Sequence, residues 1–513
     1  MSIRGLPVLV LAATAACAAA PPVVATKQAW STPSRAEPPA ARPGPARLPP
    51  PAEGPLRTTP PPALARTSAQ EPRVTEAMLP EGLRVVVVEH HRRPIASVRL
   101  VLARGARSDP PGEAGATWLA ANLATDFREE DARGEREYGE KSLRRRLVDM
   151  GAAGGAVVTA DGAILAVDGY AADLGPVLDL LGEAVISPPC GAESFKGRRD
   201  ALLDAVEDVE SGDPEALERV VVESAFGAGH PYARPARGTR RSLEPFGQEQ
   251  AVARQRELFV PKGATLLVVG DVKPDAAIAA ARKAFRRWAR EAAEPELASP
   301  PPARPSPARS VAYLRRAPAS TLVVCATRPL ADVRQPDAAL ELFGALLGGS
   351  FSSRLSEVLR EQHQLTYGVT AELVLRRYAR ALVVCAPLAA TRAEEGVRLL
   401  RQALEGLRAA PPSVVELDRA RAVVSARLET ANEDVERSTG TWLDAVLRGQ
   451  GRPRLAEERA AVAQVTPADL QAIARIALDP ATLRWVVSGE PGPANLAARA
   501  VQLGPLVPYA PRD

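Results

Sequence analysis

The sequence predicts an α/β (α+β) protein with two homologous domains, each a largely antiparallel sheet with helices packed on one face. Three observations support this prediction. The chain has 513 residues, which is long enough to bury two sizeable cores. Strand and helix patterns recur in the same order before and after a proline-rich stretch at 293–309. Both halves also close on a similar strand-to-turn run, at 263–271 and at 480–490.

In the first half, short apolar runs predict strands, and longer runs with a period of about 3.6 residues predict helices. Asp161-Gly162 is a dipeptide typical of tight hairpins, and β-type runs lie on both sides of it. The expected order is strands at 83–89 and 95–103, a helix at 115–127, strands at 156–159 and 163–167, helices at 174–186 and 195–225, a buried strand at 264–271, and a helix to about Trp288.

The second half repeats this order. Thr466 followed by Pro467 is a typical helix start, because threonine caps free N–H groups and proline has none to satisfy. The expected elements are strands at 310–314 and 321–326, a helix at 337–347, strands at 367–375 and 380–386, helices at 394–407, 413–431 and 466–478, and a closing strand within 480–490.

The N-terminus has the features of an export signal. Arg4 precedes an apolar run at 6–13 that is too short to span a bilayer permanently. Cys17 follows two alanines as in a bacterial lipobox, which predicts a lipid anchor on Cys17, with ordinary cleavage near Ala20 as the alternative. In both cases we expect the mature chain in the bacterial cell envelope, in the periplasm or at the outer membrane.

Composition then indicates the domain boundaries. Residues 21–72 are rich in Pro, Ala and Arg and lack an apolar period, as is typical of a disordered, extended tether. The expected organisation is a signal or lipoprotein segment at 1–20, the tether at 21–72, a first domain at 73–292, a linker at 293–309, a second domain at 310–490 and a tail at 491–513.

Charge and cysteine content narrow the chemistry. The 65 basic and 61 acidic residues give a net charge of only +4, evenly spread, which argues against a nucleic-acid partner. Cys325 and Cys385 each lie in an apolar β-type run. After export they could form a disulfide or remain two buried thiols, and the sequence does not decide between these states.

One segment of the first half resembles the active-site helix of a zinc peptidase. The run from Gly105 to Asn122 is similar to the G-x-R-x-E…G-x-x-H-x-x-E-H segment of the insulinase/pitrilysin-like metallopeptidases. This resemblance puts Trp118, Ala121 and Asn122 in place of the two histidines and the catalytic glutamate. Zinc needs lone-pair ligands and its bound water needs a base, which indole and methyl groups do not supply. The family's third ligand, a glutamate on a later helix, corresponds to Ala205.

The four histidines provide no obvious second zinc site. No pair has the i,i+4 spacing that presents two imidazoles on one helix face. We expect His90 and His91 to form a surface pair at a strand end, His230 to be structural and His363 to face solvent.

Three further segments resemble the same family, and together the resemblance covers about residues 77–490. They are 227–239 (G-x-x-H-P-y…G-T), 259–272 (y-x-P…l-v-v-v-G-D-v) and 347–367 (l-G-G-x-x-x-S-R-L…L-R-e-x-x-x-L-x-Y). The last implies that Arg360 and Tyr367 face the substrate cavity, where guanidinium and phenol donors can hold a peptide carbonyl and stabilise its oxyanion. A structural Arg at a helix end and a Tyr at a strand start are the alternative. Arg354 is interpreted as a structural anchor.

The resemblance therefore implies a degenerate, non-catalytic member of the insulinase-like family. We expect no cofactor on this chain, with zinc only in a homologous subunit that carries H-x-x-E-H. The two subunits would enclose an unfolded peptide substrate, and a lipid on Cys17 would hold the chain at a membrane. An envelope binding or assembly protein with no role in proteolysis is the alternative, and a self-sufficient peptidase with an unrecognised site is a third reading.

Overall fold

The computed structural model describes residues 71–125, 128–130, 136–138, 143–210, 214–288, 299–305, 311–315, 320–502 and 505–509. The predicted export segment with Cys17, most of the tether and part of the linker lie outside these residues. Within the described ranges, no helix combines the length and the apolar character that a membrane crossing requires.

The first half contains a six-stranded mixed sheet in the order β1-β2-β8-β3-β7-β6. β2 and β8 are parallel, and the other neighbouring strands are antiparallel. The predicted hairpin around Asp161-Gly162 is β6–β7. The strands are β1 Val74–Met78, β2 Arg84–Glu89, β3 Ile95–Leu102, β6 Ala153–Val158, β7 Ala163–Tyr170 and β8 Thr265–Gly270, beside the small ribbon β4 Arg128–Glu130 and β5 Arg136–Tyr138.

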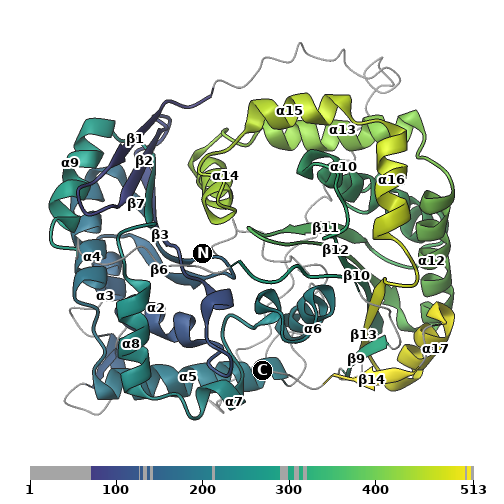
Figure 1. Cartoon of the computed structure of the whole chain (residues 1–513), viewed down its shortest axis with the longest axis horizontal. Helices are drawn as coiled ribbons and strands as arrows, with labels where there is room; N and C mark the ends of the chain where they lie inside the picture. Colours follow the sequence, from purple (N-terminus) through teal and green to yellow (C-terminus); the bar gives the residue numbers. More distant parts are fainter. Residues whose placement is uncertain are drawn as a thin grey trace, which may run out of the picture. The chain divides into compact units, whose positions relative to one another are not determined.

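Helices α2, α4 and α9 pack on one face of this sheet (Figure 1). Strand β8 shows why its sequence is apolar without alternation. Leu266 and Val268 point into the core beneath these helices, whereas Leu267 and Val269 are buried in a separate cluster on the opposite face. The helices of this half are α2 Ala116–Thr125, α3 Leu143–Asp149, α4 Leu174–Ile186, α5 Ala192–Glu210, α6 Pro214–Phe226, α7 Arg240–Leu243, α8 Gln248–Leu258 and α9 Pro274–Phe285.

The second half contains another six-stranded sheet, in the order β11-β12-β10-β13-β9-β14. Two strand pairs here are parallel, β13 with β9 and β9 with β14. The strands are β9 Val311–Arg315, β10 Thr321–Pro329, β11 Thr370–Leu375, β12 Arg380–Ala389, β13 Arg484–Gly489 and β14 Leu506–Pro508. The helices are α10 Asp337–Leu347, α11 Arg354–Ser356, the π-helix η4 Glu357–Gln362, α12 Ala393–Ala409, α13 Val414–Glu429, α14 Val435–Leu447, α15 Leu455–Gln464, α16 Pro467–Ala477 and α17 Pro491–Val501.

Each half also covers the second face of the other half's sheet with one helix. α14 of the second half packs on β3 and β8, where Trp442 and Leu443 are buried against Leu267. In return, α6 of the first half packs on β10 and β13, where Val221 is buried beside Val486. Each buried side chain of this size contributes about 1.5–3 kcal/mol. The described residues accordingly form a single compact unit.

Local details differ from the sequence-based expectation. Residues 491–501 and 506–508 of the expected tail form α17 and β14, and β14 pairs with β9 in the second sheet. The helical pattern predicted at 195–225 is two helices, α5 and α6. The strand predicted from Tyr367 begins only at Thr370, because Thr366 and Gly368 form a side-chain turn: Thr366 Oγ1 donates to Gly368 O (2.8 Å) and accepts from Gly368 N (3.2 Å). This turn leaves Tyr367 outside the sheet and exposed.

Cys325 and Cys385 form a disulfide. They lie directly opposite each other on the antiparallel strands β10 and β12, with their Cα atoms 4.1 Å apart. Both residues are buried in the cluster that α6 covers. The bond therefore joins central strands of the second sheet at the face that receives the helix from the first half.

Candidate functional site

The positions expected to have lost a zinc site lie on α2 and α5, and these helices are in contact. Trp118 is half-buried and packs against two apolar clusters, one under the sheet and one that includes α5. Ala121 is fully buried in the sheet core. Asn122 Nδ2 donates to the carbonyl of Trp118 one turn earlier (2.9 Å), and Ala205 is half-buried on α5.

These residues do not fit a zinc ion. Indole and methyl groups have no lone pair to donate, and the amide nitrogen of Asn122 is engaged within its own helix. The acidic neighbours of Ala205 are exposed, and Glu207 pairs with Arg240 at 2.6 Å. No group of three His, Cys, Asp or Glu side chains suited to a metal occurs in the part of the chain that the structure describes.

The start of α2 is held by a buried polar network. Asp109, which replaces the family's glutamate, accepts from the N–H groups of Gly115 and Thr117, both at 3.0 Å. Arg254 on α8 donates to Asp109 Oδ1 (2.9 Å) and to Thr117 Oγ1 (2.8 Å). Burial raises the pKa of Asp109, although the charge of Arg254 and the donors of Thr117 act against this shift. The motif residue is therefore retained as a helix cap rather than as part of a reactive centre.

A second buried network joins the two halves. Asp161 in the β6–β7 turn accepts from Arg107 Nε (3.0 Å), from the hydroxyl of Tyr232 (2.6 Å) and from the backbone N–H of Arg377 (3.2 Å). The Tyr232 oxygen in turn accepts from the N–H of Tyr378 (3.1 Å), whose ring lies 4.8 Å from the Arg107 guanidinium. Burial and the Asp161 charge raise the pKa of Tyr232. Arg107 and Tyr232 belong to the motif segments, so these motifs serve the contact between halves.

Arg360 and Tyr367 are brought together, as the seven-residue spacing implies. The Arg360 guanidinium lies 5.4 Å from the centre of the Tyr367 ring. A third residue, Phe351, was not expected here, and its ring centre lies 4.7 Å from the same guanidinium. Tyr367 and Phe351 are 74% and 73% exposed, so neither ring serves a core. The three side chains form a cluster just before β11, in which two exposed rings lie beside a half-buried guanidinium.

Arg354 anchors the loop that carries Phe351, in agreement with its expected structural role. Its guanidinium forms a two-bond ion pair with Glu416 at the start of α13, at 2.7 and 2.9 Å. Partial burial acts to raise the pKa of Glu416, but the bonds from Arg354 and Ser413 outweigh it and lower this pKa to about 2. The carboxylate therefore stays charged, and the loop end stays fixed to α13, over the whole physiological pH range.

Comparison with known proteins shows which chains this one is similar to. A family model described as the peptidase M16 inactive domain matches residues 248–424. The chain is M16-like. An uncharacterized zinc protease of Mycobacterium leprae (strain TN) is 25% identical over 333 residues, which are 63% of this chain and 70% of that protein. M16 is the group of the insulinase/pitrilysin-like peptidases, so the resemblance stated from the sequence motifs is confirmed.

Solved structures support the fold of the M16-like chain over most of its length. The peptidase M16 inactive domain from Pseudomonas fluorescens aligns with a TM-score of 0.69 at 21% identity, covering 82% of this chain and 98% of that one. The first half of the periplasmic protease PqqL from Escherichia coli aligns with a TM-score of 0.65 at 14% identity, covering 86% and 100%. At these identities the likeness shows the fold alone and carries no residue role.

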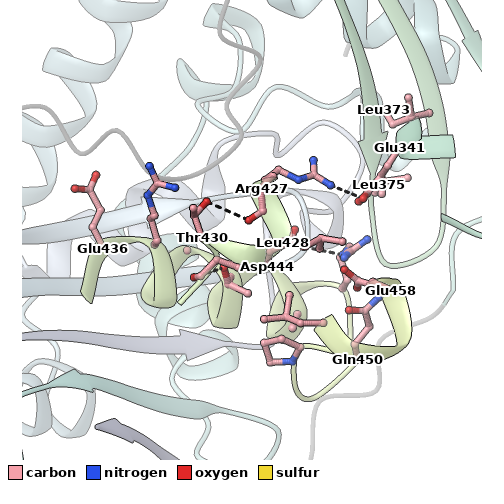
Figure 2. A pocket seen from close by; sticks show the side chains of 18 of the residues that line it. Glu341, Leu373, Leu375, Arg427, Leu428, Thr430, Glu436, Asp444, Gln450 and Glu458 are labelled. Carbon is pink, nitrogen blue, oxygen red and sulfur yellow. Dashed lines mark hydrogen bonds and ion pairs between the residues drawn. The ribbon is translucent and has the colours of Figure 1, made fainter. Parts of the chain in front are cut away.

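The second half of the M16-like chain has a polar cavity of about 700 Å³ that the sequence did not reveal. In Figure 2, Arg427 reaches across to pair with Glu341, and Asp444 and Glu458 line the same space. Arg448 pairs with Asp444 at 2.9 Å. Burial raises the pKa of Asp444, and burial together with the charge of Glu341 raises that of Glu458. Five elements line the cavity, namely α10, β11, α13, α14 and α15, and no short motif links them.

Two histidines differ from expectation, and one of them, His363, is half-buried rather than facing solvent. His90 is half-buried rather than a surface residue, and its Nε2 lies 2.7 Å from Ser438 Oγ on α14. Burial lowers its pKa, whereas bonds to Asp271 and Glu89 raise the pKa of the exposed His91. His230 is structural, because its Nε2 donates to the carbonyl of Pro301 (2.8 Å) and its Nδ1 accepts from a backbone N–H.

Proposed function

We propose that the chain is the non-catalytic subunit of an exported M16 zinc peptidase. It supplies Arg360, Tyr367 and half of a peptide-binding chamber to a homologous partner that carries H-x-x-E-H and the zinc. One observation carries the proposal: the chain presents a half-buried Arg360 beside the exposed ring of Tyr367, while Trp118, Ala121 and Asn122 on α2 offer no imidazole or carboxylate for zinc. The donors for a substrate remain, and the reacting centre is missing.

The chemistry of the pair fits a supporting role. A guanidinium and a phenol hydroxyl are hydrogen-bond donors that can hold a peptide carbonyl. When a zinc-bound hydroxide attacks that carbonyl, negative charge develops on its oxygen, and donors already in place stabilise it without reorganisation. Arg360 and Tyr367 would provide this stabilisation in trans, and the attacking water and its base would belong to the partner.

Export and membrane attachment complete the proposal. The apolar run before Cys17 supports secretion with a lipid on that cysteine. The Cys325–Cys385 disulfide supports an oxidising compartment such as the periplasm, and the likeness to a periplasmic protease agrees with it. Mass spectrometry of the mature N-terminus should find lipid on Cys17. A mature chain starting after Ala20, or an unmodified Cys17, would contradict the anchor but not the export.

The central test is turnover by the reconstituted pair. Arg360→Ala or Tyr367→Phe should lower kcat by about a hundred- to a thousandfold, the usual effect of removing one transition-state donor. Tyr170→Phe is a matched control, because Tyr170 is also exposed but lies on β7 of the first half. Wild-type turnover by both site variants would reject the role in proteolysis and favour an envelope binding or assembly protein instead.

A further inference from the structure

Arg360 presents an unusual guanidinium. Among the described residues its only charged neighbour is Glu361, at a loose 3.5 Å, and its nitrogen atoms make no hydrogen bond there. What surrounds it instead are the rings of Phe351 and Tyr367. Aromatic rings attract a guanidinium through its charge but leave its N–H groups without acceptors. The rings therefore hold the Arg360 guanidinium in place but leave its N–H groups without hydrogen-bond acceptors.

The loop that carries Phe351 is built to hold its place. At its beginning, a Cβ added to Gly348 would lie 2.8 Å from the backbone nitrogen of Ala371 on β11, so only glycine allows this close contact. At its end, Ser356 Oγ donates to the carbonyl of Ser350 (3.0 Å), and Arg354 pairs with Glu416. The Phe351 ring is therefore exposed on a loop whose two ends are both fixed, so its position is determined by the fold.

The backbone around Arg360 and Tyr367 is fixed as well. Arg360 lies in the π-helix η4, a distortion that often marks functional positions. The helix ends at Gln362, Gln364 has a positive φ of 53°, and Leu365 N–H then donates to Leu359 O at 2.8 Å. Tyr367 is held by the turn between Thr366 and Gly368. The π-helix, the Leu365–Leu359 hydrogen bond and the Thr366–Gly368 turn therefore all fix the backbone next to the Arg360 guanidinium.

We propose that Phe351 is a positioning residue of the peptide site. Its ring and that of Tyr367 hold the Arg360 guanidinium in one orientation, with its N–H groups open to a peptide carbonyl. This pre-organisation lowers the entropy that Arg360 must lose when substrate binds. The effect on turnover rests on the proposed function, whereas the positioning itself concerns this chain alone and can be tested without a partner.

The first experiment uses the chain by itself, labelled with ¹⁵N-arginine. The Nε–H signal of Arg360 is identified by its loss in Arg360→Lys. Phe351→Ala should shift this signal, because the ring current is lost, and should increase its mobility in relaxation measurements. Phe351→Tyr should retain both properties, and Tyr170→Ala, which removes an exposed ring elsewhere, should change neither. An unchanged Arg360 signal in Phe351→Ala would overturn the proposal.

The second experiment is a double-mutant cycle on the reconstituted pair, with a fluorogenic unstructured peptide as substrate. Phe351→Ala should lower kcat about two- to fivefold, the effect of one exposed cation–π contact, and Phe351→Tyr should restore it. In the Arg360→Ala background, the same change should have no further effect. An equal loss in that background, or wild-type turnover of Phe351→Ala beside an impaired Arg360→Ala, would overturn the positioning role. Wild-type turnover of Arg360→Ala would reject the proposed function and leave the first experiment to decide the positioning.

Discussion

The region between α2 and α5 and the region between α10 and α13 occupy matching places in the two halves but differ in polar content. In both halves a helix follows the first strands, then a hairpin, then two longer helices and one that crosses to the other sheet. Around α2 the matching positions are Trp118, Ala121 and Ala205, whereas the second half has a cavity lined by Arg427, Glu458 and other charged groups. The apolar cores maintain the same backbone arrangement in both halves, whereas the polar groups at matching places differ between the halves.

The polar groups of the two halves also differ in their exposure to solvent. The first half keeps the buried Asp109 cap and the Asp161 network, which hold elements together and are closed to solvent. The second half presents the cluster of Phe351, Arg360 and Tyr367, in which both rings are exposed, and a cavity lined by charged groups. A first half that is structural and a second half that offers binding groups is the division expected of a supporting subunit.

The largest effect is expected when zinc-binding residues are introduced into the first half, which would remove the difference in polar content between the two regions. Trp118→His, Ala121→Glu and Asn122→His together with Ala205→Glu should give near-stoichiometric zinc, because the four positions lie on α2 and α5, which are in contact, and the set supplies three ligands and a base. Elemental analysis of the purified chain measures this. The same set without Ala205→Glu should retain far less zinc and should not cleave peptide. Equal zinc in both variants would show that Ala205 is not the third ligand position.

The next largest effect is expected in the buried network between the halves. Asp161→Ala removes the buried carboxylate that pairs with Arg107 and accepts from Tyr232, which should cost about 3–5 kcal/mol in unfolding free energy. Urea unfolding of the chain measures this. The control is Glu207→Ala, which removes an exposed ion pair with Arg240 and should cost less than about 1 kcal/mol. Similar losses for both variants would show that the Asp161 network contributes no more than a surface pair.

Local patterns allowed much of the fold to be predicted. The bounds of α4 and α10 agree with the apolar period, and the Asp161-Gly162 hairpin and the repeated order of elements follow from short-range signals. Arg360 and Tyr367 could be paired because they are close in sequence. The helix exchange could not be predicted, since the apolar pattern of β8 requires burial of both faces but does not identify α14 as the cover. The cavity is formed by distant elements, so only the folded chain reveals it.

The smallest expected effect is on the stability of the chain and comes from Glu458 in the cavity of the second half. Its dependence on pH tests whether the charged groups of this cavity oppose folding. Burial and the charge of Glu341 raise the pKa of Glu458 above its ordinary value of 4.5, so the folded chain binds this proton more tightly than the unfolded chain. The sign follows directly: the charged form opposes folding, and this penalty is absent below pH 4.5 and complete once the pH exceeds the raised pKa. Glu458→Gln should therefore stabilise the chain at pH 7, by less than about 1 kcal/mol because the side chain is only half-buried. Thermal unfolding at pH 7 and pH 4 tests this, with the exposed Glu457→Gln as control. A gain that is equal at both pH values would mean that the effect is not electrostatic, and that the carboxylates of the cavity do not repel one another.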